Sequence, residues 1–213
     1  MAKPSASPAR TGRARRFDPE TEQELLLDAT LKVLRRNDYA DVAIADILEE
    51  AGLSTRSFYR HFESKDELLL MLYRRDAEAA TARLLDRVGK ADSAPAALEA
   101  WIDEILSFRF DRRKAERVAL LGAASARRAE GYAVEAVQSA RMISAPLIEV
   151  LEQGRRDGSF PDAEPRPHAE MIRAIVFDLA GLNSSGRGPV PRDTATRDVV
   201  RFCLRALGAD LET

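Results

Sequence analysis

Apolar residues recur along most of this chain at intervals of three and four positions, the spacing of one face of an α-helix. Leu26, Ala29, Thr30 and Val33 form one such inner stripe. No segment shows the strict alternation of a half-buried strand, and no internal repeat is visible. The pattern therefore predicts an all-α protein. The expected helices span approximately residues 18–36, 44–51, 54–62, 64–89, 93–108, 113–129, 132–156, 166–182 and 193–207.

Capping residues mark several of the expected helix ends. Asp18 followed by proline begins the first helix, because a carboxylate can accept an orphan N–H and proline suits the first helical position. Ser64 and Glu67 form a capping box. Asp193 is expected to cap the last helix. These signals favour helices with defined starts over one continuous helical region.

Two short helices joined by a tight turn are expected between residues 44 and 62. Gly52 ends the first, because glycine readily adopts the left-handed conformation of a helix exit. Ser54 caps the second helix, and Phe58 and Phe62 lie four residues apart on its inner face. This arrangement indicates a helix-turn-helix, whose second helix enters the DNA major groove.

The segment DILEEAGLSTRSFYRHFESKDELL, within residues 39–72, resembles the DNA-binding region of the TetR/AcrR family of bacterial regulators. The resemblance implies an N-terminal three-helix DNA-binding domain followed by a C-terminal helical domain for ligand binding and dimerisation. Ala43 replaces the Ser or Thr cap common in the family. Thr55 and Arg56 replace its common Lys and Gly. The altered reading surface means that relatives do not predict the operator sequence.

Phe58 and Phe62 define the inner face of the second helix, so the polar side chains elsewhere on this helix are the candidate DNA contacts. Arg56, Ser57 and Arg60 are expected to face base edges with Thr55 nearby. The resemblance assigns Tyr59, His61 and Lys65 to phosphates. The expected contacts of this region are therefore Ser54, Thr55, Arg56, Ser57, Tyr59, Arg60, His61 and Lys65.

Residues 1–16 contain five basic residues and no acid, and proline, alanine, serine and glycine dominate the remainder. This composition predicts an unstructured arm. Arg13, Arg15 and Arg16 are candidates for contact with DNA phosphates or the minor groove. The alternative interpretation is a solubilising tail.

Three regions are expected: the arm at 1–16, the helix-turn-helix domain at 17–66 and the helical ligand-binding and dimerisation domain at 67–213. The helix over 64–89 is too long for a three-helix DNA-binding domain alone. It is therefore expected to connect the second and third regions and to transmit movement between them.

The last two helices carry apolar residues on more than one side, which indicates burial on two sides. A single domain can supply both sides, but a symmetric bundle of two helices from each of two chains is the favoured interpretation. The expected interface of this homodimer comprises Ile175, Leu179, Leu182, Val199, Phe202, Cys203 and Ala206.

Aromatic and apolar residues in the C-terminal half are candidates for a ligand cavity between helices. The alternative is that they only fill the core. A largely apolar small-molecule effector is favoured over a phosphorylated one, because few charges fall on these faces. The candidate residues are Trp101, Ile105, Phe108, Met142 and Phe177, with Arg109 or Asp178 as a polar anchor.

Composition narrows the class of protein further. The net charge is −2, and there are two histidines and one cysteine. Neither a metal site nor a cofactor is expected, and catalytic motifs are missing, so the chain is not expected to be an enzyme. No apolar run is long enough to span a membrane, and a lone cysteine suits a reducing cytoplasm.

Three hypotheses follow. The leading one is a ligand-released repressor that binds a palindromic operator as a dimer. The others are a regulator controlled by a protein partner, which a C-terminal core without a cavity would favour, and a helical small-molecule-binding protein or enzyme with an incidental motif.

Overall fold

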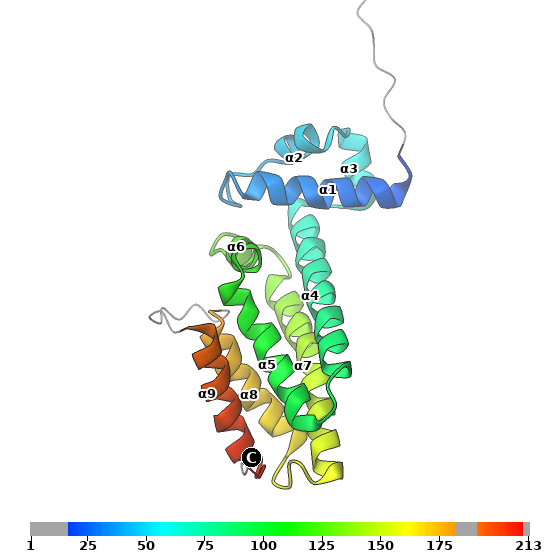
Figure 1. Cartoon of the computed structure of the whole chain (residues 1–213). Coiled ribbons are helices and arrows are strands. Elements are labelled where there is room, and N and C mark those ends of the chain that lie inside the picture. The colour runs from blue at the N-terminus through cyan, green and yellow to red at the C-terminus, as the bar shows by residue number, and fades with distance from the viewer. Residues whose placement is uncertain (1–16, 182–190, 211–213) are drawn as a thin grey trace, which may run out of the picture.

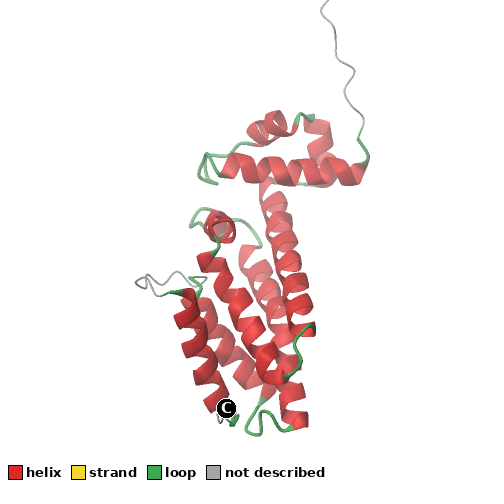
Figure 2. Ribbon diagram, in the orientation of Figure 1, coloured by secondary structure: helices red, strands yellow, loops and turns green. Residues whose placement is uncertain are grey.

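The computed structural model describes residues 17–181 and 191–210 of the chain, and every regular element within these ranges is a helix (Figure 2). This confirms the all-α class predicted from the periodicity. The helices are α1 (Pro19–Leu34), α2 (Ile44–Ala51), α3 (Thr55–His61), α4 (Lys65–Gly89), α5 (Ala94–Phe110), α6 (Arg112–Leu121), the short 3-10 helix η1 (Ala126–Arg128), α7 (Tyr132–Asp157), α8 (Pro165–Leu179) and α9 (Arg192–Ala206).

The buried apolar residues form two separate cores. The N-terminal core joins α1, α2 and α3 through residues such as Leu26, Ile47 and Phe58, all fully buried. It also takes Leu72 from α4 and Ala126 from η1. Packing of the first unit therefore continues beyond residue 66, the end expected for that domain.

The C-terminal core is built around α5. This helix contacts α4, α6, α7, α8 and α9, so it must be apolar on several sides. Trp101, Ile102, Ile105 and Leu106 accordingly have no exposed surface. Figure 1 shows α1 lying across the end of α4, while α4 extends from the N-terminal domain along the C-terminal bundle.

The connecting helix α4 begins and ends where the sequence predicts. Ser64 caps it by accepting a hydrogen bond from the backbone N–H of Glu67, at 3.1 Å. Its first turns contribute to the N-terminal core, and Leu84 contributes to the C-terminal core. One continuous helix therefore belongs to both cores, which gives movement at either end a direct mechanical path to the other.

The helix expected over residues 113–129 is interrupted. α6 ends at Leu121, and the chain turns at Gly122 before η1. A Cβ at Gly122 would lie 2.9 Å from the carbonyl oxygen of Val118, so glycine suits this turn. The turn lets Leu121 and Ala126 reach the N-terminal core, a tertiary requirement that helical periodicity does not reveal.

The two last helices also differ at their ends from the sequence prediction. α8 stops at Leu179, before Gly181 adopts a left-handed φ of 76°. α9 begins at Arg192 with Pro191 as the N-cap residue, so Asp193 lies in the first turn and does not cap the helix. Arg192 is held there by two hydrogen bonds to the Asp103 carboxylate, at 2.7 and 3.0 Å.

Among the described residues, no helix combines the length and the apolar character needed to cross a membrane.

Candidate DNA-binding surface and C-terminal domain

The turn between α2 and α3 has the geometry expected of a helix-turn-helix. Gly52 ends α2 with a left-handed φ of 65°. The Ser54 hydroxyl accepts the backbone N–H of Ser57 at 3.2 Å and so caps α3. Phe58 and Phe62 are buried in the N-terminal core. This anchoring fixes which side of α3 remains outside.

The start of α2 lacks a capping hydroxyl because Ala43 occupies the N-cap position. The Asp46 carboxylate nevertheless accepts the backbone N–H of Ala43, at 2.9 Å. This is the reciprocal half of a capping box, and an acidic residue there also suits the positive end of the helix dipole. Asp46 of α2 therefore compensates in part for the hydroxyl that is missing at Ala43.

Five of the expected DNA-contacting residues of the motif are solvent-exposed: Ser54, Thr55, Arg56, Tyr59 and Arg60. Tyr59 leaves 59% of its surface exposed, which is large for an aromatic residue. Tyr59 also contacts the Phe58 ring edge-on, with centroids 5.3 Å apart, so its ring is supported from within.

Ser57 departs from the expectation that it faces a base edge. It is buried, and its hydroxyl lies 3.1 Å from that of Ser54. The reason is its helical position beside the inward Phe58, which turns it toward the motif's own turn. In this structure its role is to support the cap.

Arg60 and His61 both contact a residue of α1. The Arg60 Nη1 atom donates to Oε2 of Glu22 at 2.9 Å, and Nε2 of His61 lies 3.1 Å from the same oxygen. The Glu22 side chain is only 6% exposed, whereas that of Arg60 is 47% exposed. Arg60 is therefore held against α1, and its predicted contact with base edges stays a prediction.

Sequence reasoning missed Glu22, although a signal was present. Glu22 precedes Leu26 by four positions, in line with the apolar stripe that α1 presents to the core. A carboxylate in an apolar stripe needs a buried partner. The neighbouring Glu20 and Glu24 are exposed and give no such signal.

Lys65 also differs from its expected position at a phosphate. Its Nζ atom donates to the carbonyl oxygens of Tyr39 and Val42, at 2.9 and 2.8 Å, and lies 4.4 Å from the centre of the Tyr39 ring. These contacts tie the start of α4 to the segment before α2. Burial, together with the acceptor Asp66, raises the pKa of Tyr39. Lys65 thus has a structural role here, and its phosphate contact stays a prediction.

The basic arm, with Arg13, Arg15 and Arg16, lies outside the described residues, as does Leu182 of the expected dimer interface.

The expected ligand-pocket residues meet in the C-terminal core. Trp101 and Ile105 are fully buried, and the indole N–H of Trp101 donates to the carbonyl oxygen of Ile143 at 3.1 Å. Phe177 is 8% exposed, while Phe108 and Met142 are half-buried. No water-sized space adjoins Trp101 or Ile105, because neither has any accessible surface. In this structure these two residues fill the core, as the alternative interpretation states.

The two proposed polar anchors lie at the edge of this core. Arg109 donates through Nη1 to the carbonyl oxygen of Leu179, at 3.2 Å, and so links α5 to the end of α8. Asp178, which precedes Leu179 in the sequence, is half-buried. Both Arg109 and Asp178 therefore lie near the C-terminal end of α8, and neither lines either of the two surface hollows of the described part of the molecule.

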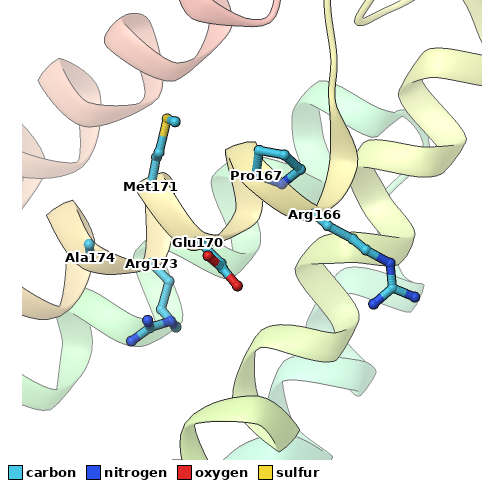
Figure 3. Close-up of a pocket in the computed structure, with 6 residues that line it drawn as sticks. All are labelled: Arg166, Pro167, Glu170, Met171, Arg173 and Ala174. Atoms are coloured by element: carbon cyan, nitrogen blue, oxygen red, sulfur yellow. The ribbon is translucent and has the colours of Figure 1, made fainter.

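One hollow of about 540 Å³ runs along α8, with all its lining side chains supplied by that helix, from Arg166 to Ala174 (Figure 3). A second, of about 230 Å³, lies between the α1–α2 segment and α6. The first hollow is broad and includes Met171, which is 59% exposed. This is a surface of α8 and not an interior cavity.

The expected interface residues divide into two groups. Val199 and Cys203 are 6% and 1% exposed and belong to the chain's own core, so they offer little surface to a second chain, and their place in the dimer interface stays a prediction. They face α5 because α9 packs directly on that helix. Burial raises the pKa of the Cys203 thiol to about 12, which keeps it protonated and unreactive at neutral pH.

The second group remains on the surface or near it. Phe202 is 57% exposed and Ala206 is also exposed, while Ile175 and Leu179 are half-buried. Figure 1 shows α8 and α9 side by side along one edge of the molecule. Leu179 packs against the C-terminal core, whereas Met171 and Ile175 of α8 and Phe202 and Ala206 of α9 leave apolar surface outside it.

The structure combines an all-helical fold with an N-terminal helix-turn-helix domain, and proteins with the same combination are known. Residues 26–72 match the family described as bacterial regulatory proteins, tetR family. The regulator CymR of Pseudomonas putida is 34% identical over 105 residues, which are 49% of this chain and 51% of CymR. This match therefore spans about half of CymR.

Two further proteins are similar over most of the chain. An uncharacterised HTH-type regulator of Haemophilus influenzae is 25% identical over 200 residues, or 92% of this chain and 94% of its own. The crystal structure of FadR from Bacillus subtilis in complex with stearoyl-CoA aligns with a TM-score of 0.69. That alignment covers 86% of this chain and 98% of FadR at 15% identity, so it shows the fold.

The N-terminal helix-turn-helix domain of this chain therefore matches that of the tetR family of bacterial regulatory proteins over residues 26–72, and the whole chain shares the fold of solved regulators.

Proposed function

We propose that the protein is a transcriptional repressor that binds a palindromic operator as a homodimer. The observation that carries this proposal is the outer side of α3, where Thr55, Arg56 and Tyr59 are exposed on a helix anchored by Phe58. Hydroxyl, guanidinium and phenol groups are donors suited to base edges and phosphates. The arm residues Arg13, Arg15 and Arg16 would add phosphate contacts, and the DNA partner implies a cytoplasmic location.

The exposed apolar face of α8 and α9 supports a homodimer. Met171 and Phe202 expose 59% and 57% of their surfaces, and a second copy related by two-fold symmetry would cover both. Two recognition helices would then meet successive major grooves about 34–36 Å apart, or a multiple of that distance. The symmetry of the dimer is what predicts a palindromic operator.

We further propose a small, largely apolar effector that enters between the helices of the C-terminal bundle and releases the operator. The FadR structure contains stearoyl-CoA, whose long acyl chain is apolar although its CoA part is phosphorylated, so only the acyl chain resembles the proposed effector. In our structure Trp101 and Ile105 are fully buried and pack directly against neighbouring side chains. The effector must therefore favour a state in which these helices separate, and it shifts that equilibrium only through its higher affinity for the open state.

A second candidate is a regulator controlled by a protein partner. The closed packing around Trp101 favours it, because a partner acts on the surface and needs no interior space. A helical enzyme with an incidental motif is disfavoured, since the family consists of transcriptional regulators. The two regulator hypotheses share the same DNA-binding surface and differ only in what controls it.

One experiment tests the proposal in two steps. The wild-type protein selects duplexes from a random-sequence library, and a palindrome is the expected product. Operator affinity is then measured with and without stearoyl-CoA, the ligand of the similar Bacillus regulator. Selection of no duplex would overturn the DNA-binding proposal. If stearoyl-CoA raises the melting temperature but leaves operator affinity unchanged, control by a protein partner becomes the better hypothesis.

A further inference from the structure

The contact between Glu22 and the recognition helix is separate from the apolar anchoring of that helix. α3 is already anchored by Phe58 and Phe62, which are 0% and 1% exposed. Glu22 is instead aimed at the two basic residues that end α3, Arg60 and His61. A nearly inaccessible carboxylate thus lies directly behind the side of the domain that carries the candidate DNA contacts.

The charge balance of α3 shows what this carboxylate changes. Residues Thr55–His61 include two arginines and no acid, a formal charge of +2 when His61 is neutral. Glu22 reduces the combined charge to +1. Arg56 is exposed, and no described hydrogen bond or ion pair involves it, so of the two arginines only Arg60 is bound to Glu22.

A carboxylate and a phosphate compete for the same group. Both are oxyanions that accept charge-assisted hydrogen bonds from a guanidinium. Arg60 keeps nearly half of its side-chain surface exposed, so it can reach solvent, yet its Nη1 is committed at 2.9 Å to an acceptor within the protein. A DNA phosphate can meet the remaining N–H groups of Arg60, but it gains the donor on Nη1, and the full charge of the guanidinium, only by displacing Glu22.

We propose that Glu22 is a specificity-determining residue of the DNA-binding surface, one that withholds Arg60 from sequence-independent phosphate contacts. Non-specific binding depends almost entirely on phosphate contacts, whereas specific binding adds base contacts that orient the helix. By keeping one arginine bound and the end of α3 in place, Glu22 lowers affinity for random DNA more than affinity for the operator. The inference rests on the proposed DNA-binding function.

The first test is a salt titration of binding to a random-sequence duplex. Glu22→Ala frees Arg60 for one further phosphate contact, which increases the steepness of the log affinity against log salt plot by about 0.9. Release of one counterion corresponds to roughly fivefold tighter binding at about 0.15 M salt. Glu22→Gln keeps an acceptor oxygen but removes the charge, so we expect a smaller change in the same direction. The ratio of operator affinity to random-duplex affinity should fall in both variants.

Two controls separate this mechanism from a general charge effect. Glu20→Ala removes the same charge from an exposed position on α1, and no described contact joins Glu20 to Arg60. It should leave the salt slope almost unchanged. The double variant Glu22→Ala/Arg60→Ala should bind random DNA with the same affinity as Arg60→Ala, because the guanidinium that Glu22→Ala would free is absent.

The outcomes are distinguishable. A wild-type protein that binds no duplex would refute the proposed function itself. If the wild type binds DNA but Glu22→Ala has the same salt slope as the wild type, the role of Glu22 is overturned while the proposed function stands. The same holds if Glu20→Ala gains as much affinity for random DNA as Glu22→Ala does. A gain that persists without Arg60 would also overturn that role. Circular dichroism checks that each variant is folded, and if Glu22→Ala is not, Glu22→Gln decides.

Discussion

The N-terminal domain and the C-terminal bundle each bury a glutamate, but they surround it differently. In the N-terminal domain, Glu22 contacts Arg60 and His61, which are neighbours on the single short helix α3. That helix also carries the exposed candidate DNA contacts. The partners of Glu22 are therefore residues for which an external ligand can compete.

In the bundle, Glu104 is contacted from two other helices. Lys114 of α6 lies 2.7 Å from its carboxylate, and Arg83 and Arg87 of α4 lie 3.2 and 3.1 Å away. The adjacent Asp103 binds Arg87 and Arg192, which brings α9 into the same network. This cluster joins four helices, so we interpret it as a stabilising network and not as a ligand site.

Glu22 and Glu104 are equally buried but have different kinds of partner, so burial of a carboxylate does not by itself indicate its role. What matters is whether its partners belong to an exposed functional helix or to several helices of one core. The following predictions test this distinction between the two regions.

The largest effect is expected from a cavity in either core. Leu98→Ala and Leu26→Ala each remove a fully buried side chain, in the C-terminal and N-terminal core respectively. Each should lower the free energy of unfolding by about 2–5 kcal/mol. Trp101 is the only tryptophan and lies in the C-terminal core, so its fluorescence during urea unfolding reports that core. Leu98→Ala should shift this transition more than Leu26→Ala. Equal shifts would show that α4 makes the two cores one cooperative unit.

The next effect concerns the outer and inner sides of α9. Phe202→Asp places a charge on the exposed apolar face and should weaken the proposed dimer by roughly 30-fold to 1,000-fold, as loss of an interface anchor does. Val199→Asp places the same charge in the core and should unfold the bundle. Sedimentation velocity and circular dichroism distinguish these results. A Phe202→Asp variant that remains dimeric would move the interface elsewhere.

A smaller effect is expected for Glu104→Gln, which removes the carboxylate shared by Lys114, Arg83 and Arg87 and, among the described residues, leaves only Arg87 with a second carboxylate, that of Asp103. Breaking a buried ion pair costs about 3–5 kcal/mol, and solvent access to the arginines reduces this to about 2 kcal/mol. Asp86→Asn is the matched control, because Asp86 and Lys90 form an exposed pair. Its cost should stay below about 0.5 kcal/mol. Chemical denaturation at neutral pH measures both.

The pH dependence of this network gives a second readout. Burial alone raises the pKa of Glu104, but hydrogen bonds and charge from Lys114, Arg87 and Arg83 outweigh it, and the pKa falls below 4.5. A carboxyl whose pKa is lower in the folded state stabilises the fold above its unfolded pKa, and this contribution is lost as pH falls through the folded pKa. Wild-type stability should therefore decline below about pH 4.5 more steeply than that of Glu104→Gln. Identical slopes would mean that the charge of Glu104 contributes nothing.

The smallest effects concern the caps of the helix-turn-helix. Ser54→Ala removes the hydroxyl that caps α3 and should cost about 1 kcal/mol. Ala43→Ser adds a hydroxyl where α2 has none and should stabilise the domain by about 0.5–1 kcal/mol. Thermal unfolding followed by circular dichroism measures both changes, whose signs should be opposite. A neutral Ala43→Ser would indicate that Asp46 already compensates for the missing cap.

The helical class, the helix-turn-helix and most helix starts could be predicted from the amino-acid sequence alone. These features depend on neighbours within one or two turns: Ser54 and Ser64 cap the helices that follow them, and Gly52 ends α2 through its own backbone conformation. Phe58 and Phe62 could be placed on the inner side of α3 because helical spacing alone decides which residues share a face. Local physics is sufficient for such features.

The partner that each inward-facing or charged residue contacts could not be predicted from the sequence and became known from the packing of the helices. Val199 and Phe202 both belong to an apolar helix, but the packing of α9 on α5 buries the first and leaves the second exposed. From the sequence, both Arg60 and Lys65 are reasonable DNA contacts. In the structure, Arg60 is bonded to Glu22, and Lys65 is bonded to the carbonyl oxygens of Tyr39 and Val42. These contacts join residues 23 to 38 positions apart, a separation over which helical periodicity carries no information.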